Sequence, residues 1–225
     1  MKKPTVDYSG FRLSRLTEPR FSHLFLLLGW VFYFTMYILT EKLIPAEACH
    51  VVHSVVDDWI PFREEFLIFY CFWYLLVFVS AVYFLLYDVD SFKKLHVFLL
   101  ITQVVSVAVY IIYPTRQDLR PASFERQNFL TALMANIYAA DTNTGVCPSI
   151  HVAYSIAIAS VWLKYREASR LWKAFIAVIT VLICLSTMFV KQHSFVDVVA
   201  AAALCLVAEV IVFHVIYPNR KPAQA

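Results

Sequence analysis

The chain has 225 residues, of which 61% are hydrophobic and only 16% are charged, and its formal net charge is +3. A soluble domain is normally about one-quarter charged, and one small core cannot hide this much apolar surface. The basic residues are scattered along the chain, so composition gives no support to nucleic acid binding. We therefore expect an integral membrane protein in which residues 1–225 form a single membrane domain.

The membrane spans are located by long stretches that lack Asp, Glu, Lys and Arg. Backbone groups in a bilayer must be satisfied within the segment, so these stretches are expected to be helical. Glu209 interrupts the last stretch, and it is interpreted either as a hydrogen-bonded helix contact or as part of a proton path. The sequence thus predicts an all-α fold with six transmembrane helices, at residues 21–40, 66–87, 95–113, 148–163, 174–190 and 198–217.

The orientation follows from the basic residues between the spans. Most of the 19 Lys and Arg residues precede the first span, follow the second or fourth span, or lie in the tail, where Arg220 and Lys221 stand. This side is expected to be cytoplasmic, with both termini inside. The short loops and compact size favour a bacterial plasma membrane. The sequence leaves the oligomeric state open.

Two longer loops, residues 41–65 and 114–147, are expected on the external side. Within the second loop, residues 128–140 are typical of a short amphipathic helix at the interface. This helix is either a structural lid or a segment that contacts substrate. Cys49 and Cys147 fall in these loops, so a disulfide between them is an alternative to two free thiols. The cysteine spacing matches no metal-binding motif, and no metal or cofactor is expected.

Three histidine and aspartate side chains at this external face have spacings that suit catalysis. His193 and Asp197 are four residues apart, so on a helix they share a face and the carboxylate can reach the imidazole. Such a carboxylate fixes the ring tautomer and stabilises the charge that a nucleophilic histidine develops. His151 lies near the start of the fourth predicted span. The topology brings these residues to one side of the membrane.

Polar and basic residues near these histidines are candidates for binding a phosphate. Ser149 stands where the N–H groups of a first helical turn favour an anion. Arg120 ends a short basic stretch that includes Arg116, and a guanidinium can bind a phosphate through two N–H groups. Lys191 adds a point charge next to the His193 segment. Each feature alone is ordinary helix-end chemistry, but their convergence favours a functional site.

The residues resemble the three signature motifs of the type 2 phosphatidic acid phosphatase (PAP2) superfamily, which includes vanadium haloperoxidases. The second motif, Pro-Ser-Gly-His, appears as Pro148-Ser149-Ile150-His151. The third, Ser-Arg-x5-His-x3-Asp, appears as Ser186-Thr187 followed by His193 and Asp197. The first, Lys-x6-Arg-Pro, keeps only Arg120-Pro121, and Tyr113 stands in place of the lysine. The Lys-Gln-His run and the non-glycine second motif are similar to the branch that includes inositol phosphorylceramide synthases.

The resemblance implies a six-helix membrane protein with a haloperoxidase-type helical core that dephosphorylates a phospholipid or polyprenyl phosphate among the membrane lipids. His193 would attack phosphorus, Asp197 would orient the His193 ring, and His151 would serve as acid and base. This mechanism requires no metal. The phosphoryl oxygens would be bound by Arg120, Lys191, Ser149 and Arg116. A lipid headgroup phosphotransferase is the alternative, and a transporter or scaffold is disfavoured because both histidines, the aspartate and the arginine are present.

Overall fold

The computed structural model describes residues 3–218, and the basic residues Lys2, Arg220 and Lys221 of the orientation argument lie outside the described residues. Within that range the chain is largely helical. Five of the described helices are long and apolar enough to cross a membrane: Ser22–Leu43, Glu64–Tyr87, Val89–Ile112, Arg170–Phe189 and Phe195–Ile216. They correspond to five of the six predicted spans, and the remaining predicted span, 148–163, is a shorter apolar helix.

The third span begins earlier than the sequence predicts, whereas the first two begin close to their predicted positions. The first starts as a 3-10 segment, Ser22–Leu27, and continues as α1, Leu28–Leu43. α3 (Leu67–Tyr87) is joined to α4 (Val89–Ile112) by Asp88 alone. The Asp88 carboxylate caps α4, because it accepts hydrogen bonds from the Ser91 N–H at 3.3 Å and hydroxyl at 2.8 Å. α4 therefore starts before residue 95 and includes Lys93 and Lys94.

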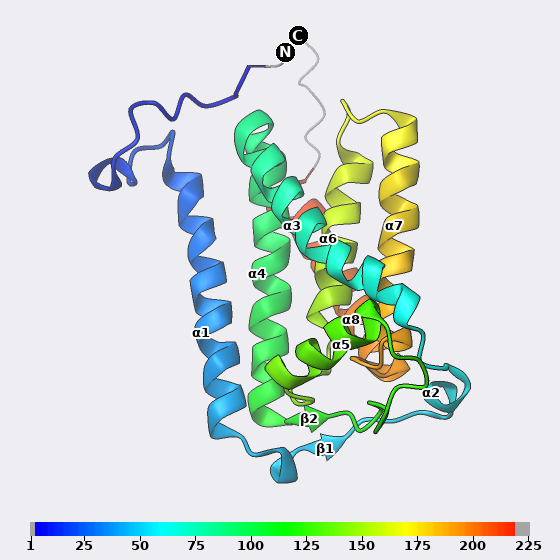
Figure 1. Ribbon diagram of the computed structural model, residues 1–225. Helices are drawn as coiled ribbons and strands as arrows, with labels where there is room; N and C mark the ends of the chain where they lie inside the picture. The colour runs from blue at the N-terminus through cyan, green and yellow to red at the C-terminus, as the bar shows by residue number, and fades with distance from the viewer. Residues whose placement is uncertain (1–2, 219–225) are drawn as a thin grey trace.

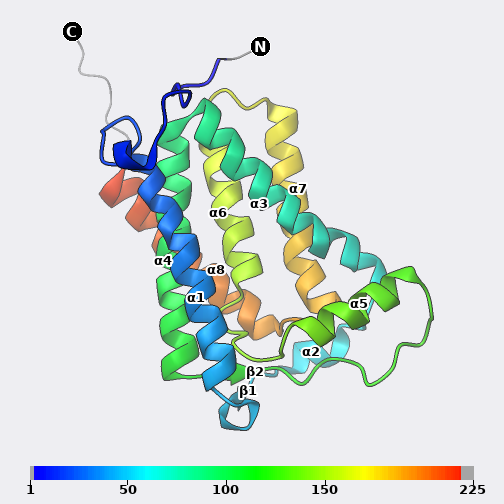
Figure 2. The same cartoon turned by 60° about the vertical axis from the view of Figure 1, so that its left-hand side comes forward.

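The short helix α6, Ile150–Lys164, is the centre of the bundle. It packs against α3 and α4, and against α7 (Arg170–Phe189) and α8 (Phe195–Val210), which continues as a π-helical segment, Ile211–Ile216. Ala153 and Ala157 are fully buried on α6, and small side chains let neighbouring helices approach closely. α1 packs against α4 at the edge of the bundle (Figures 1 and 2).

One end of the bundle carries the loop structure that encloses the candidate site (Figure 1). β1 (His50–Val51) pairs in parallel with β2 (Thr115–Arg116), so the loops 41–65 and 114–147 are tied together. The same end holds α2 (Val55–Trp59) and α5 (Phe129–Ala140). α5 buries Met134 in a cluster with Leu67, Tyr70 and Val190. Single 3-10 turns occur at Leu13–Arg15, Ala46–Ala48 and Glu64–Phe66.

Glu209, the acidic residue within the last span, contacts α6. Its carboxylate accepts a hydrogen bond from the Ser160 hydroxyl and forms an ion pair with Lys164. The Lys164 ammonium also donates to the Ser160 hydroxyl at 3.0 Å. Glu209 therefore joins α8 to α6 as a helix contact, in which its charge is matched by Lys164. The five cysteines, including Cys49 and Cys147, are free.

Candidate active site

The start of α6 is fixed to the start of α8. Ser149 is the N-cap of α6, where its hydroxyl accepts from the Val152 N–H at 3.4 Å. The Ser149 N–H in turn donates to the Asp197 carbonyl oxygen at 3.2 Å. Ser149 is fully buried, and its hydroxyl is engaged as the helix cap. This contact places His151, in the first turn of α6, beside the residues of α8.

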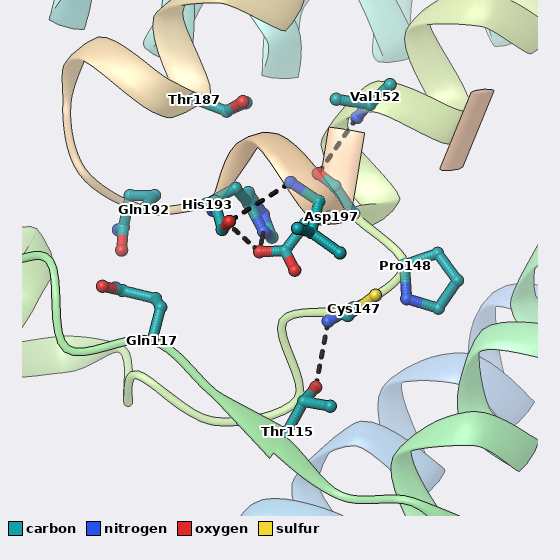
Figure 3. A network of polar contacts seen from close by, with 12 residues as sticks. Thr115, Gln117, Cys147, Pro148, Val152, Thr187, Gln192, His193 and Asp197 are labelled. Atoms are coloured by element: carbon teal, nitrogen blue, oxygen red, sulfur yellow. Dashed lines mark hydrogen bonds and ion pairs between the residues drawn. The ribbon is translucent and has the colours of Figure 1, made fainter. Parts of the chain in front are cut away.

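His193 and Asp197 form a buried hydrogen-bonded pair at the beginning of α8 (Figure 3). The Asp197 Oδ2 atom lies 3.2 Å from His193 Nδ1 and accepts from the Ser194 N–H at 2.9 Å. Asp197 has no exposed surface. An ionised carboxylate only accepts hydrogen bonds, so the proton of a neutral His193 ring lies on Nδ1. Nε2 then carries the lone pair that a nucleophile requires.

The second histidine lies next to the first. The ring centroids of His151 and His193 are 5.7 Å apart, and the ring planes are inclined by 60°. His151 is held between Tyr70, at 4.6 Å, and Trp73, at 4.4 Å between centroids. Its Nε2 atom has no hydrogen-bond partner among the described residues. The two imidazoles thus share one site, as the sequence motifs predict.

A cavity of about 590 Å³ adjoins the two histidines. α1 and α3 contribute most of the aromatic residues in its lining. Two of these, Phe34 and Phe78, are exposed, so one side of the cavity lies at the outer surface of the bundle. Cavities of this size enclose most of a small ligand. The aromatic side chains in its lining are Trp30, Tyr33, Phe34, Tyr37, Tyr70, Trp73, Tyr74, Phe78, Tyr110 and Tyr154.

Arg120 lies beside a second, polar hollow of about 390 Å³. Its guanidinium donates to the carbonyl oxygens of Tyr138, Asp141 and Thr142 at 3.1, 2.8 and 2.7 Å. It also donates to Gln192 Oε1 at 2.8 Å and lies over the Tyr138 ring, 4.6 Å from its centroid. Arg120 therefore caps the C-terminal end of α5 and contacts, through Gln192, the loop that precedes α8.

The remaining predicted phosphate-binding cations are directed elsewhere. The Lys191 ammonium donates to the carbonyl oxygens of Ile60 and, at 3.0 Å, Asp57. Burial lowers the pKa of this amine, and the charges of Asp57 and Asp58 oppose that shift. Arg116 pairs with Asp118 at 3.4 Å. Neither Lys191 nor Arg116 lines the aromatic cavity.

Asp57 is a buried residue that the sequence interpretation did not select. Its carboxylate accepts from the Ser194 hydroxyl at 2.6 Å and from the Phe195 N–H at 2.7 Å, at the N-terminus of α8. Burial acts to raise the pKa of Asp57, but hydrogen bonds from Ser194, Phe195 and Ser54 outweigh it and hold the pKa below its ordinary value. The sequence feature that could have identified Asp57 is its capping-box spacing from Ser54.

Cys147 lies near the His193–Asp197 pair (Figure 3). Burial raises the pKa of this thiol to about 12, and the charge of Asp197 adds to the shift. The thiol therefore stays protonated near neutral pH and is a poor nucleophile. Its N–H donates to the Thr115 hydroxyl at 3.2 Å, which ties the loop before α6 to β2.

The comparisons with known proteins identify one family. A family model described as the PAP2 superfamily matches residues 94–221, which is more than half of the chain. The matched range includes Arg120, His151, His193 and Asp197. The comparisons with curated proteins and with solved structures found no match.

Proposed function

The chain belongs to the PAP2 superfamily, and on this premise we propose that it is a lipid phosphate phosphatase that acts through a phosphohistidine. Members of the superfamily include phosphatases and phosphotransferases. The observation that carries the proposal is the placement of two imidazole rings, 5.7 Å apart, beside an aromatic cavity that reaches the apolar surface of the bundle. Such a site offers acid–base chemistry next to a compartment for acyl or prenyl chains.

The nucleophile of the proposed reaction is His193. Its Nε2 lone pair attacks phosphorus, and the bond from phosphorus to the lipid oxygen breaks. The ring becomes positively charged, and the Asp197 carboxylate, 3.2 Å from Nδ1, stabilises that charge. Because Asp197 is buried and also bound to the Ser194 N–H, it holds the ring in one orientation.

The acid and base of the proposed reaction is His151. It protonates the departing lipid oxygen, then accepts a proton from water as the water oxygen attacks the phosphohistidine. Inorganic phosphate leaves and His193 is restored. The ring contacts of His151 with Tyr70 and Trp73 keep its imidazole next to His193 through both steps. All the groups in this scheme are side chains, so it uses neither a metal nor a cofactor.

The proposed substrate is a phospholipid or polyprenyl phosphate that enters from the membrane between α1 and α3. The proposed topology has six spans, with α6 as the fourth, and a site on the extracytoplasmic face of a bacterial plasma membrane. The distribution of basic residues supports this orientation. Lys93 and Lys94 lie near the beginning of α4, Lys164 ends α6 and Arg170 begins α7. These helix ends lie at the end of the bundle opposite α2 and α5, which is the cytoplasmic end in this scheme (Figure 1).

A headgroup phosphotransferase resembling inositol phosphorylceramide synthase is the second candidate. The observation in its favour is the polar hollow beside Arg120, which shares Asp141, Thr142 and Thr144 with the aromatic cavity. This hollow could hold an acceptor alcohol in place of water. Phosphate release from a simple lipid phosphate without added alcohol supports the phosphatase, whereas product formation that requires a second alcohol supports the transferase.

The test uses purified protein in detergent, a panel of lipid phosphates and diphosphates, and a chelator. We expect His193→Ala to lower turnover at least about 1,000-fold and Asp197→Asn to lower it about 100-fold or more, as for other residues of a catalytic unit. The control is His53→Ala, because His53 is exposed and pairs with Asp58 at the surface. An acid-labile phosphoenzyme should form in the wild type and be absent from His193→Ala. Near-normal turnover by folded His193→Ala protein would disprove the mechanism.

A further inference from the structure

Gln192 directly precedes His193 and lines the aromatic cavity together with both histidines. Its side chain is buried, with 4% of the residue exposed. The N–H groups of Gln192 and His193 both donate to the Thr187 carbonyl oxygen, at 2.9 and 3.0 Å. The turn also contains Lys191 with a positive φ of 52°. Gln192 is therefore held on the same hydrogen-bonded turn as the proposed nucleophile (Figure 3).

Arg120 determines which way the Gln192 amide faces. A guanidinium can only donate hydrogen bonds, so the 2.8 Å contact places the amide oxygen of Gln192 toward Arg120. The amide nitrogen is consequently directed away from the guanidinium. That nitrogen is buried and has no hydrogen-bond partner within residues 3–218. A buried donor without a partner is costly, and a ligand that supplies an acceptor would remove the cost.

The site needs such a donor because two cations of the family motifs are replaced. Tyr113 stacks on His50 with ring centroids 4.1 Å apart, and the Thr187 hydroxyl donates to the Cys184 carbonyl oxygen at 2.8 Å. Lys191 is bound to carbonyl oxygens near α2. None of these three residues lines the aromatic cavity.

We propose that Gln192 is a catalytic residue whose amide N–H donates to a phosphoryl oxygen as negative charge develops in the transition state. Arg120 is a positioning residue that acts by holding the amide oxygen. The inference rests on the proposed function, because it takes His193 as the nucleophile. A donor that is oriented before the reaction stabilises the transition state more than the ground state. The effect of its removal therefore falls on kcat rather than on KM.

The first experiment replaces Gln192 with Ala, or with Met to keep the volume, and measures kcat and KM on a short-chain lipid phosphate. We expect kcat to fall about 100-fold, as for the loss of one oxyanion donor, with KM nearly unchanged. Inhibition by orthovanadate should weaken in parallel, whereas binding of the dephosphorylated lipid should not change. The control is Gln127→Ala, because Gln127 is exposed and lies outside the cavity lining. Wild-type kcat and vanadate inhibition in a folded Gln192 variant would overturn the proposal.

The second experiment separates the two roles by combining variants. If Arg120 acts through the amide, Arg120→Lys lowers kcat in the wild type but lowers it little further in the Gln192→Ala background. If the fold losses in kcat of the two single variants multiply in the double variant, Arg120 acts independently of Gln192, which overturns its positioning role. His193→Ala is measured in parallel. Turnover by His193→Ala defeats the proposed function, whereas an inactive His193→Ala protein beside a fully active Gln192→Ala protein defeats this inference alone.

Discussion

Replacing Asp57 with alanine is expected to loosen the loop that carries His193. The Asp57 carboxylate is 2% exposed and bonds to the first turn of α8 through the Ser194 hydroxyl at 2.6 Å and the Phe195 N–H at 2.7 Å. It also accepts from the Ser54 N–H at 2.8 Å. Alanine removes these acceptors and leaves buried donors without partners.

The size of the effect follows from these contacts. A hydrogen bond to a charged group contributes about 1.5–3 kcal/mol, so the two bonds to α8 contribute about 3–6 kcal/mol to the free energy of unfolding. In a chain of 225 residues, each kcal/mol shifts Tm by about 2–4 °C. Asp57→Ala should therefore lower Tm by roughly 6–24 °C. A drop in kcat should accompany it, because the His193–Asp197 pair is on the same turn.

The assay is thermal unfolding in detergent, followed by tryptophan fluorescence, with turnover measured below the transition. Asp58→Ala is the matched control: Asp58 is the next residue, its side chain is 60% exposed, and its partner is the surface residue His53. Its effect should stay within about 0.5 kcal/mol. Equal melting temperatures for the two variants would refute the argument that Asp57 holds the start of α8.

Three further predictions concern the same structure. The pKa of Asp57 is lowered in the folded protein. The stability advantage of wild type over Asp57→Asn should therefore be complete above about pH 4 and lost as the pH falls through the folded pKa. Denaturant titrations at several pH values measure this advantage, and an advantage that persists at about pH 1 contradicts the prediction. Lys191→Met leaves two carbonyl oxygens without their donor and should cost about 1–3 kcal/mol in unfolding free energy; unchanged stability with a raised KM would instead assign Lys191 to the phosphate. Ala81→Trp narrows the cavity on α3 and should raise KM for long-chain but not short-chain lipid phosphates in steady-state assays; equal effects on both would refute entry by this route.

The family and the helical membrane architecture could be predicted from the sequence. Apolar runs of the right length are helices in a bilayer whatever their partners, and the predicted PAP2 relationship is confirmed by the family match. The subgroup and the exact number of spans stay predictions. The start of α4 was misplaced because Lys93 and Lys94 were interpreted as a loop, whereas the Asp88 cap lets the helix begin before them.

The roles of the charged residues depended on contacts between distant segments. The sequence predicted that Arg120 and Lys191 bind a phosphate directly. In the structure Arg120 bonds to carbonyl oxygens and to Gln192, and Lys191 bonds to carbonyl oxygens of residues 57 and 60. Backbone carbonyl groups occur at every residue, so no residue pattern marks which of them will receive a cation. Direct contact of Lys191 with substrate stays a prediction, and for Arg120 we propose the positioning role through Gln192 instead.

The sequence by itself determined the local features: where the chain is apolar enough to be a membrane helix, and that His193 and Asp197, four apart, share a helix face. Only the tertiary structure decided that His151 lies between two aromatic rings beside His193, and that Asp57 reaches Ser194 across 137 positions of the chain. The physical reason is the range of the forces involved. Helix formation and capping act over a few residues, whereas a buried polar group takes whichever partner packing brings within about 3 Å.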